Sequence, residues 1–227
     1  MTKSNSKKFA SGVAGLLTAV CMACPALAAP PPVNALPTGG AVVGGSANIV
    51  TNGGTHTETI TQFTNKAIID WQTFNIGSNA KVVFNQTRGS GSVALNRINS
   101  SNGVSQIYGR LTANGTVILA NGSGIYFGPS AHVNVGGLIA TTSSITNSDF
   151  MNDNRYHFTA GSNPDAVIIN DAAPTFFDWD RGIHTNKEGG LIAFLAPTVK
   201  NNGYIEAKAG TVVLAGGDTA TFVDLYG

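Results

Sequence analysis

The sequence predicts an all-β protein built as a β-solenoid, in which short strands stack coil upon coil. The first observation is the segment Gly115–Gly128, where short β-branched runs alternate with Asn and Gly corners. The second is repetition: the pattern returns at Gly210–Gly217, and Gly136–Ala140 is echoed by Gly189–Ala193. The third is that no helical pattern separates these units. Repeated strand-and-corner units are typical of a solenoid, which usually serves as a scaffold or a binding surface.

The first 28 residues are predicted to be a secretory signal peptide. A basic start is followed by a small, apolar stretch from Gly12 to Cys24 and by a small-x-small cleavage site at Ala26–Ala28. The apolar stretch is shorter than the ~20 residues that a membrane-spanning helix needs. We expect the Sec machinery to carry the chain across the inner membrane, with cleavage after Ala28. A lipoprotein signal would need a Leu three residues before Cys21 or Cys24, and none stands there.

The cysteines and the charge balance limit the function. Cys21 and Cys24 lie in the predicted leader, so the mature chain would contain no disulfide, no thiol nucleophile and no zinc–thiolate site. Three of the 13 Lys and Arg, and none of the 12 Asp and Glu, lie in this leader. The remainder is slightly acidic, so we expect no polybasic face for nucleic acid or anionic lipid. Only 11% of all residues are charged, which suits β-sheets whose outer faces are Ser, Thr and Asn.

The predicted elements begin with a Pro-rich, extended lead-in at 29–38. Short strands are expected at 41–43 and 46–50. Over 55–64 Thr occupies alternate positions, a mostly polar pattern that predicts an exposed hairpin or edge strand. Further short runs end at Asn, Gly or Ser corners and predict strands at 67–71, 82–84, 93–95, 106–108, 117–119, 125–127, 133–135 and 138–140. Their spacing predicts stacked coils of roughly 20 residues.

Residues 146–188 interrupt this rhythm with many Asp and aromatic residues. We expect an excursion from the solenoid whose aromatic side chains pack back against its flank, with the coils resuming at 189. The domain is therefore predicted to extend over 39–227. No capping helix follows the last coil, and an uncapped solenoid exposes strand edges, so we expect the chain to be the front part of a longer protein.

An ordered series of segments resembles a known family. The series consists of Ala67–Gly77, Val83–Gln86, Val93–Ile98, Ile107–Gly109, Leu111–Gly115, Gly124–Gly128 and Val133–Ala140. In this order the segments resemble the filamentous haemagglutinin N-terminal domain, which is the secretion domain of two-partner secretion exoproteins. The resemblance is to the branch that includes high-molecular-weight adhesins and haem-scavenging exoproteins, and it covers about Gly39 to Gly217.

The resemblance implies a right-handed parallel β-helix with an N-terminal cap and extra-helical hairpins. It implies that an outer-membrane barrel transporter exports the chain, after periplasmic POTRA domains of that transporter recognise it. The protein would then be secreted or held at the cell surface, where its first coils would nucleate folding of a large adhesin or haemagglutinin. Regions downstream could bind a host glycan or receptor. We expect neither a cofactor nor enzymatic activity.

The residues expected to serve transporter recognition or fold nucleation lie in the matching segments; they are Asn75, Asn85, Gln86, Asn96, Arg97, Asn121 and Gly124. The family's Asn-Pro-Asn-Gly motif aligns with Asn121–Gly124, where Gly122 and Ser123 replace the Pro and the second Asn. This departure loosens a turn that Pro would have stiffened.

Each of these residues also has a purely structural interpretation. Asn121 could be a corner residue that stacks on Asn114. The polar pairs at 85–86 and 96–97 could cap backbone groups at coil ends, because buried amides must be paired. Arg97 could form a hydrogen-bond hub with Asp70.

Two other classes of function are open from the sequence. Asp178, Asp180 and His184 could serve glycoside cleavage or metal-assisted lyase chemistry in a free-standing β-helical enzyme. Such chemistry needs two carboxylates facing each other across a cleft at ~5–9 Å, and a bend closed by Asp side chains explains the same residues. The four His are scattered without metal-ligand spacing. Alternatively, the aromatic segment from Phe150 to Trp179 could make the domain an adhesive module for a glycan or receptor.

Overall fold

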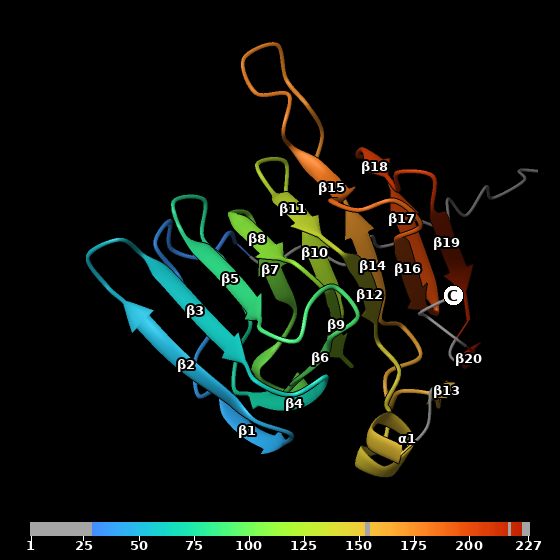
Figure 1. Cartoon of the computed structure of the whole chain (residues 1–227). Helices are drawn as coiled ribbons and strands as arrows, with labels where there is room; N and C mark the ends of the chain where they lie inside the picture. The colour runs from blue at the N-terminus through green and yellow to red at the C-terminus, as the bar shows by residue number, and fades with distance from the viewer. Residues whose placement is uncertain (1–28, 153–154, 218, 224–227) are drawn as a thin grey trace, which may run out of the picture.

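Three β-sheets form the walls of a parallel β-helix (Figure 1). The computed structural model describes residues 29–152, 155–217 and 219–223, so the predicted leader at 1–28, with both cysteines, lies outside the described residues. Sheet 1 contains, in spatial order, β1 (Ala41–Gly44), β4 (Lys66–Trp71), β6 (Val93–Ile98), β9 (Thr116–Asn121), β12 (Gly137–Thr141), β16 (Leu191–Ala196) and β19 (Thr211–Gly216). Sheet 2 contains β17 (Thr198–Asn201), β14 (Val167–Asn170), β10 (Ile125–Phe127) and β7 (Ser105–Ile107). Sheet 3 contains β18 (Ile205–Glu206), β15 (Gly182–Thr185), β11 (His132–Val135), β8 (Arg110–Ala113), β5 (Lys81–Gln86), β3 (Thr57–Gln62) and β2 (Ala47–Asn52).

Each coil passes through the three sheets in the same order. From β9 the chain enters sheet 2 as β10, then sheet 3 as β11, and returns to sheet 1 as β12. Each of these strands lies parallel to its counterpart one coil earlier, β10 to β7, β11 to β8 and β12 to β9. Strands of sheet 1 begin at residues 93, 116 and 137, so these coils span 21 to 23 residues. The predicted all-β fold of stacked parallel coils is confirmed.

The inner core runs along the axis of the coils. In sheet 1 the register aligns Leu119, Ala140 and Phe194 in one inward-facing row, and all three are fully buried. Phe127 of β10 stacks on Phe194, with ring centroids 5.6 Å apart. Because each coil covers the apolar side chains of the previous one, stability is shared between neighbouring coils.

Sheet 1 is buried on its outer face as well. The helix α1 (Asn147–Asn152) and β13 (Arg155–Phe158) supply Phe150, Tyr156 and Phe158, which pack with outward-facing residues such as Ile118 and Ile139. The strand β20 (Ala220–Val223) pairs antiparallel with β13. Strands buried on both faces appear in a sequence as continuous apolar runs, which explains why the segments of sheet 1 do not alternate. Within the described ranges, no helix is long and apolar enough to span a membrane.

Antiparallel strands close one end of the β-helix. β1 pairs antiparallel with β4, and β2 pairs antiparallel with β3. The segment 55–64, predicted as an exposed hairpin or edge strand, supplies the single strand β3, which forms a hairpin with β2. Its predicted exposure is wrong, because β3 also pairs parallel with β5 and buries Glu58, Ile60 and Gln62. The polar side chains of this strand therefore point inward at alternate positions, although polar alternation usually indicates an exposed strand.

The Pro-rich lead-in packs on the first coil. The backbone N–H of Asn79 donates to Val33 O at 2.7 Å, and the N–H of Gly77 donates to Ala35 O at 2.9 Å. Leu36 is partly buried against the inner core. The lead-in thus contributes to the closed end of the β-helix.

The excursion expected over 146–188 is two shorter segments. β14 and β15 lie within this range, yet they occupy regular positions in sheets 2 and 3. The first segment, from α1 to β13, packs its aromatic residues on the flank as predicted. The second is the loop at 171–181, whose Phe176, Phe177 and Trp179 are 81%, 93% and 73% exposed. These three do not pack back, and the loop stands clear of the sheets before β15 (Figure 1).

Candidate recognition and folding residues at the coil corners

Asn121 and Gly124 form the turn that leads from sheet 1 to sheet 2. Asn121 is fully buried, and its Nδ2 donates to Gly103 O at 3.0 Å and to Ser105 Oγ at 2.9 Å. Its Oδ1 accepts from the N–H of Ser123, and the N–H of Gly124 donates to Asn121 O at 3.0 Å, which closes the turn. Ser123 Oγ also donates to Ser100 O at 2.7 Å. Side-chain hydrogen bonds therefore hold the turn that Pro stiffens in the family motif.

Gly124 is required by both conformation and space. Its φ is +114°, a region that residues with a side chain rarely adopt. A Cβ at this position would lie 2.6 Å from Val167 O on the next coil. The turn thus brings two coils close together.

Gln86 forms the corner that leads from sheet 3 to sheet 1. Its side chain is 1% exposed; Nε2 donates to Gln62 Oε1 at 3.1 Å and to Thr116 O at 3.3 Å, while Oε1 accepts from the N–H of Gly115 at 2.6 Å. Gln62 in turn donates to backbone carbonyls of Thr64 and Val93. This amide ladder satisfies backbone groups of successive coils that would otherwise be buried without partners.

Asn114 belongs to the Gln86 corner, not to that of Asn121. Asn114 Oδ1 accepts from the backbone N–H of Gln86 at 2.8 Å, and its Nδ2 donates to the backbone O of Gln86 at 2.9 Å. The expected stacking of Asn121 on Asn114 is therefore wrong, because the two residues end different strands and so occupy different corners. Sequence spacing alone does not distinguish the two kinds of corner.

Asn96 is a fully buried amide in the inner core of sheet 1. Its Oδ1 accepts from the indole N–H of Trp71 at 3.0 Å, and its Nδ2 donates to Ala94 O and Ile118 O at 3.3 and 3.2 Å. Every polar atom of this side chain has a partner, as a buried amide requires. Asn96 therefore fixes Trp71 against the first coils.

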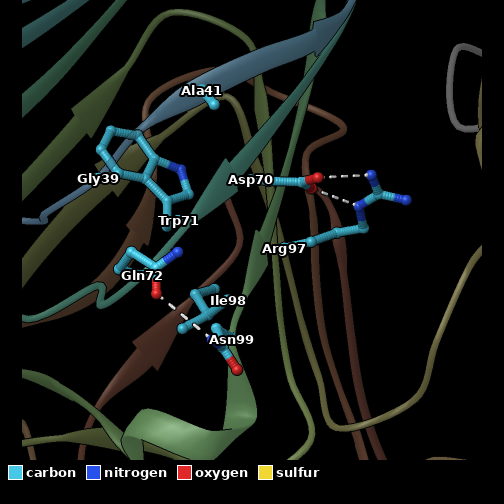
Figure 2. Close-up of a pocket in the computed structure, with 8 residues that line it drawn as sticks. All are labelled: Gly39, Ala41, Asp70, Trp71, Gln72, Arg97, Ile98 and Asn99. Atoms are coloured by element: carbon cyan, nitrogen blue, oxygen red, sulfur yellow. Dashed lines mark hydrogen bonds and ion pairs between the residues drawn. The ribbon is translucent and has the colours of Figure 1, made fainter.

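Arg97 and Asp70 form the hub predicted from the sequence, on the opposite face of the same strands. Arg97 Nε lies 2.7 Å from Asp70 Oδ1, and a second guanidinium nitrogen lies 3.1 Å from Oδ2. Figure 2 shows this pair beside Trp71 and Gln72, which line an open hollow near β1. Arg97 also donates to Asn147 Oδ1 of α1 at 2.6 Å, and thereby ties the flanking helix to sheet 1.

The last two predicted residues differ in exposure. Asn75 is half-buried, and its Oδ1 accepts from the backbone N–H of Gln106 at 2.8 Å, which joins the first coil to β7. Asn85 on β5 is exposed. No hydrogen bond of the Asn85 side chain is found among the described residues.

The seven predicted residues therefore do not form one site. Gln86, Asn96, Asn121 and Gly124 lie inside the coils, where a folded protein offers them to no partner. Sequence reasoning missed Gln62, which completes the amide ladder, and Asn170, which is fully buried and donates to Asn201 Oδ1 at 2.7 Å. The signal for Asn170 was its place directly after the apolar run at 167–169, the same pattern that marks Asn121.

Two of the three enzyme-like residues, Asp178 and His184, lie in separate hydrogen-bonded pairs. Asp178 lies 3.0 Å from His132 Nε2 and 3.1 Å from Arg181 Nε. Hydrogen bonds from His132 and then Arg181 hold the pKa of Asp178 below its ordinary value. His184 pairs with Glu206 at 3.3 Å. Among the described residues no group of three or more His, Cys, Asp or Glu is placed to hold a metal ion.

Comparison with known proteins identifies the family. The family model of the TPS secretion domain matches residues 33–225. Two heme/hemopexin-binding proteins of Haemophilus influenzae, one from strain Rd, are 47% and 46% identical over 110 and 101 residues, which are 48% and 44% of this chain but 12% and 11% of those proteins. The crystal structure of the HMW1 secretion domain from Haemophilus influenzae matches with a TM-score of 0.68 and 31% identity, over 82% of this chain and 46% of that chain. The chain belongs to the family of TPS (two-partner secretion) secretion domains, the secretion-directing domains of exoproteins that cross the outer membrane.

Proposed function

We propose that this chain starts the folding of a large adhesin- or haemagglutinin-like exoprotein, in addition to directing its export. The observation that carries this proposal is the open last rung of sheet 1. In β19, Val212 and Leu214 continue the rows that form the inner core in the preceding rungs, yet they are 44% and 45% exposed. One more parallel strand would cover them, which is favourable by ~25 cal/mol per Å² of apolar surface. In a longer exoprotein, this rung would serve as a template for another coil.

The partner in this proposal is an outer-membrane barrel transporter with periplasmic POTRA domains. A leader at 1–28 would deliver the chain to the periplasm through the Sec machinery. Strand edges of the incompletely folded chain would then pair with a strand of the transporter, since backbone hydrogen bonds supply affinity in such β-augmentation. Outside the cell the coils would form one after another from the closed end. This order needs no ATP, because each completed coil templates the next.

The predicted residues divide into two roles under this proposal. Asn85 is exposed and its side chain makes no hydrogen bond within the described chain, so we assign it to contact with the transporter. Gln86, Asn96, Asn121 and Gly124 are assigned to fold nucleation, because their contacts join successive coils. Asn75 and Arg97 also join structural elements and belong with this second group.

The activity of the complete exoprotein would reside outside the segment that this chain shares with its relatives. The relatives are named for binding heme and hemopexin, so haem capture is one activity to test in the complete exoprotein, beside adhesion to a host glycan or receptor. The enzyme alternative has no support in the arrangement of Asp178 and His184, which are held in separate ion pairs.

Export is tested by expressing the chain with and without the cognate barrel transporter and assaying the culture medium. We expect the chain in the medium only when the transporter is present, and in the periplasm otherwise. Equal amounts in the medium under both conditions would contradict the proposal.

A pair of variants separates recognition from folding. Asn85→Ala should lower export while the melting temperature of the purified chain stays unchanged. Asn121→Ala should lower the melting temperature, because it leaves the buried Ser105 Oγ and the backbone O of Gly103 without the donor that Asn121 supplies. If Asn85→Ala is exported as well as the wild type, the assigned recognition role of Asn85 is wrong.

A further inference from the structure

The outer face of sheet 3 carries a groove whose lining residues, apart from Asn85 at one end, have no part in the proposed secretion role. Three open hollows lie on this face and share lining residues. Arg110 and His132 belong to the first and second hollows, and Thr112, Asn134 and Asn186 belong to the second and third. Their lining extends from β3 to β18, so the groove crosses the strands and follows the axis of the β-helix.

The floor of the groove is a ladder of hydrogen-bonding side chains. The register aligns Thr112, Asn134, His184 and Glu206 on successive strands of sheet 3. Neighbouring strands lie ~4.8 Å apart, so hydroxyl, amide and imidazole groups recur at a regular interval. A regular ladder of this kind suits an extended polymer whose own polar groups repeat.

One wall of the groove concentrates positive charge. Lys81 of β5 lies directly beside Arg110 of β8, which lies beside His132 of β11. Like charges directly opposite each other on neighbouring strands are unfavourable. Neither Lys81 nor Arg110 has an ion-pair partner within the described part of the chain. An anionic ligand would remove this unfavourable pairing.

Two acids near this wall already have partners. Asp178 pairs with Arg181 and lies beside His132, and Glu206 lies beside His184. Asp180 is the remaining acid and lines the middle hollow. The overall charge of the chain is close to neutral, so the adjacent cations Lys81 and Arg110 are a local feature of this face.

An exposed aromatic residue lies, in the sequence, between two residues that line the groove. Trp179 is 73% exposed and lies between Asp178, which lines the first hollow, and Asp180, which lines the second. The root of its loop is fixed, because Asp171 accepts hydrogen bonds from Tyr126 and Asn202 at 2.7 and 2.8 Å. Exposed apolar groups rimmed by polar residues mark ligand-binding grooves.

We propose that the outer face of sheet 3 binds an acidic polysaccharide along the β-helix axis. The adjacent cations Lys81 and Arg110 would contact its carboxylate or sulfate groups. The ladder from Thr112 to Glu206 would bond its hydroxyls, and Trp179 would cover the apolar face of a sugar ring. A polypeptide strand fits this face less well, because the backbone groups in the middle of a sheet are already paired. A lipid chain fits it less well, because the floor is polar.

The test measures binding of the purified chain to heparin, with neutral dextran and phosphatidylglycerol vesicles as comparison probes. We expect saturable binding to heparin, weakened by salt, and no binding to dextran. The double variant Lys81→Gln/Arg110→Gln should weaken heparin binding at least about fivefold. The matched control is Arg155→Gln/Lys200→Gln, which removes the same two residue types from β13 and β17, away from the groove, and should keep the wild-type affinity.

Three results would overturn the proposal. These are no binding to heparin, equal weakening by both double variants, and binding to the vesicles but not to heparin, which would indicate a lipid surface instead. Trp179→Ala supplies a second readout, because it should weaken heparin binding without changing the net charge or the melting temperature. Export through the transporter should be normal in all these variants, so this proposal and the secretion proposal fail independently.

Discussion

The two ends of the β-helix differ in what covers the inward-facing rows of side chains in sheet 1. At the closed end Ile69 is fully buried, since antiparallel strands and Leu36 of the lead-in cover the first coil. At the other end Leu214 occupies the same row, five strands further on, and is 45% exposed. At one end the row finishes on an antiparallel strand, where Val42 is 36% exposed, and at the other it finishes on a parallel strand, where Leu214 is exposed. Under the proposed function, the β-helix would grow from the antiparallel end towards the parallel end.

The largest expected effect comes from making an equivalent truncation at both ends. Ile69→Ala should lower the free energy of unfolding by about 2–5 kcal/mol, because it leaves a cavity in a closed core. Leu214→Ala should lower it by about 1 kcal/mol, because roughly half of that side chain is in water already. Urea denaturation of the purified chain measures both. Equal losses at the two positions would show that the last rung is covered in solution, and the contrast between the ends would be lost.

The next effect tests the corner that joins coils between the two ends. Gly124→Ala should destabilise the chain by about 1–3 kcal/mol, because it combines a positive φ with a close contact to Val167 O. Gly89→Ala is the matched control, since Gly89 has a φ of +92° but nothing within 4 Å of the added Cβ. Gly89→Ala should lower the free energy of unfolding by about 1 kcal/mol. A similar loss for both would mean that the approach of the two coils at Gly124 adds nothing.

A pH dependence is expected at the closed end, where Glu58 is 2% exposed. Burial raises the pKa of Glu58 above its ordinary value, and the hydrogen bond from Thr51 to its Oε2 opposes this only in part. Its Oε1 has no partner among the described residues. Because the unfolded chain releases this proton at a lower pH than the folded chain, stability falls as pH rises through the window between the two pKa values.

Glu58→Gln should therefore raise the melting temperature at pH 7, and the gain should vanish below the ordinary pKa of a Glu. Melting curves from pH 3 to pH 8 measure this difference. Glu188→Gln is the control, since Glu188 is exposed and the substitution should change stability little at any pH. A gain for Glu58→Gln that is the same at pH 3 and pH 7 would exclude ionisation as its cause.

The smallest effect is expected for the surface pair beside the closed end. Asp70→Asn removes the charge that Arg97 binds in two places, but the two side chains are 45% and 28% exposed. Exposed pairs contribute about 0–1 kcal/mol, and the contribution falls with added salt. Denaturation at low and high salt measures it. A loss above 2 kcal/mol would show that the hub with Asn147 holds α1 in place.

The repeated apolar runs and their corners were sufficient to predict the stacked parallel strands. Segments such as Val117–Leu119 were predicted as strands, since they are short and β-branched and their corners carry Asn and Gly. The Arg97–Asp70 pair was also predictable, because two polar residues near the ends of successive apolar runs meet when the coils stack. Asn121 and Gly124 were identified as a turn for the same reason.

The residues that failed prediction depend on which face of a strand points inward. Glu58 and Gln62 look like exposed residues in a polar strand, and only the pairing of β3 with β5 turns them into the core. Phe176, Phe177 and Trp179 look like core residues, and only the positions of β14 and β15 leave their loop outside. The alignment of Lys81, Arg110 and His132 is likewise invisible in the sequence, where 28 and 21 residues separate them.

The sequence by itself thus determined the unit of this protein, a short strand and a corner, because these depend on neighbouring residues and on local backbone conformation. Only the tertiary structure decided which unit lies on which, and therefore which amides are buried, which end is open and which charges form a row. Those properties arise between coils, where residues 20 or more positions apart become neighbours across a strand spacing of ~4.8 Å.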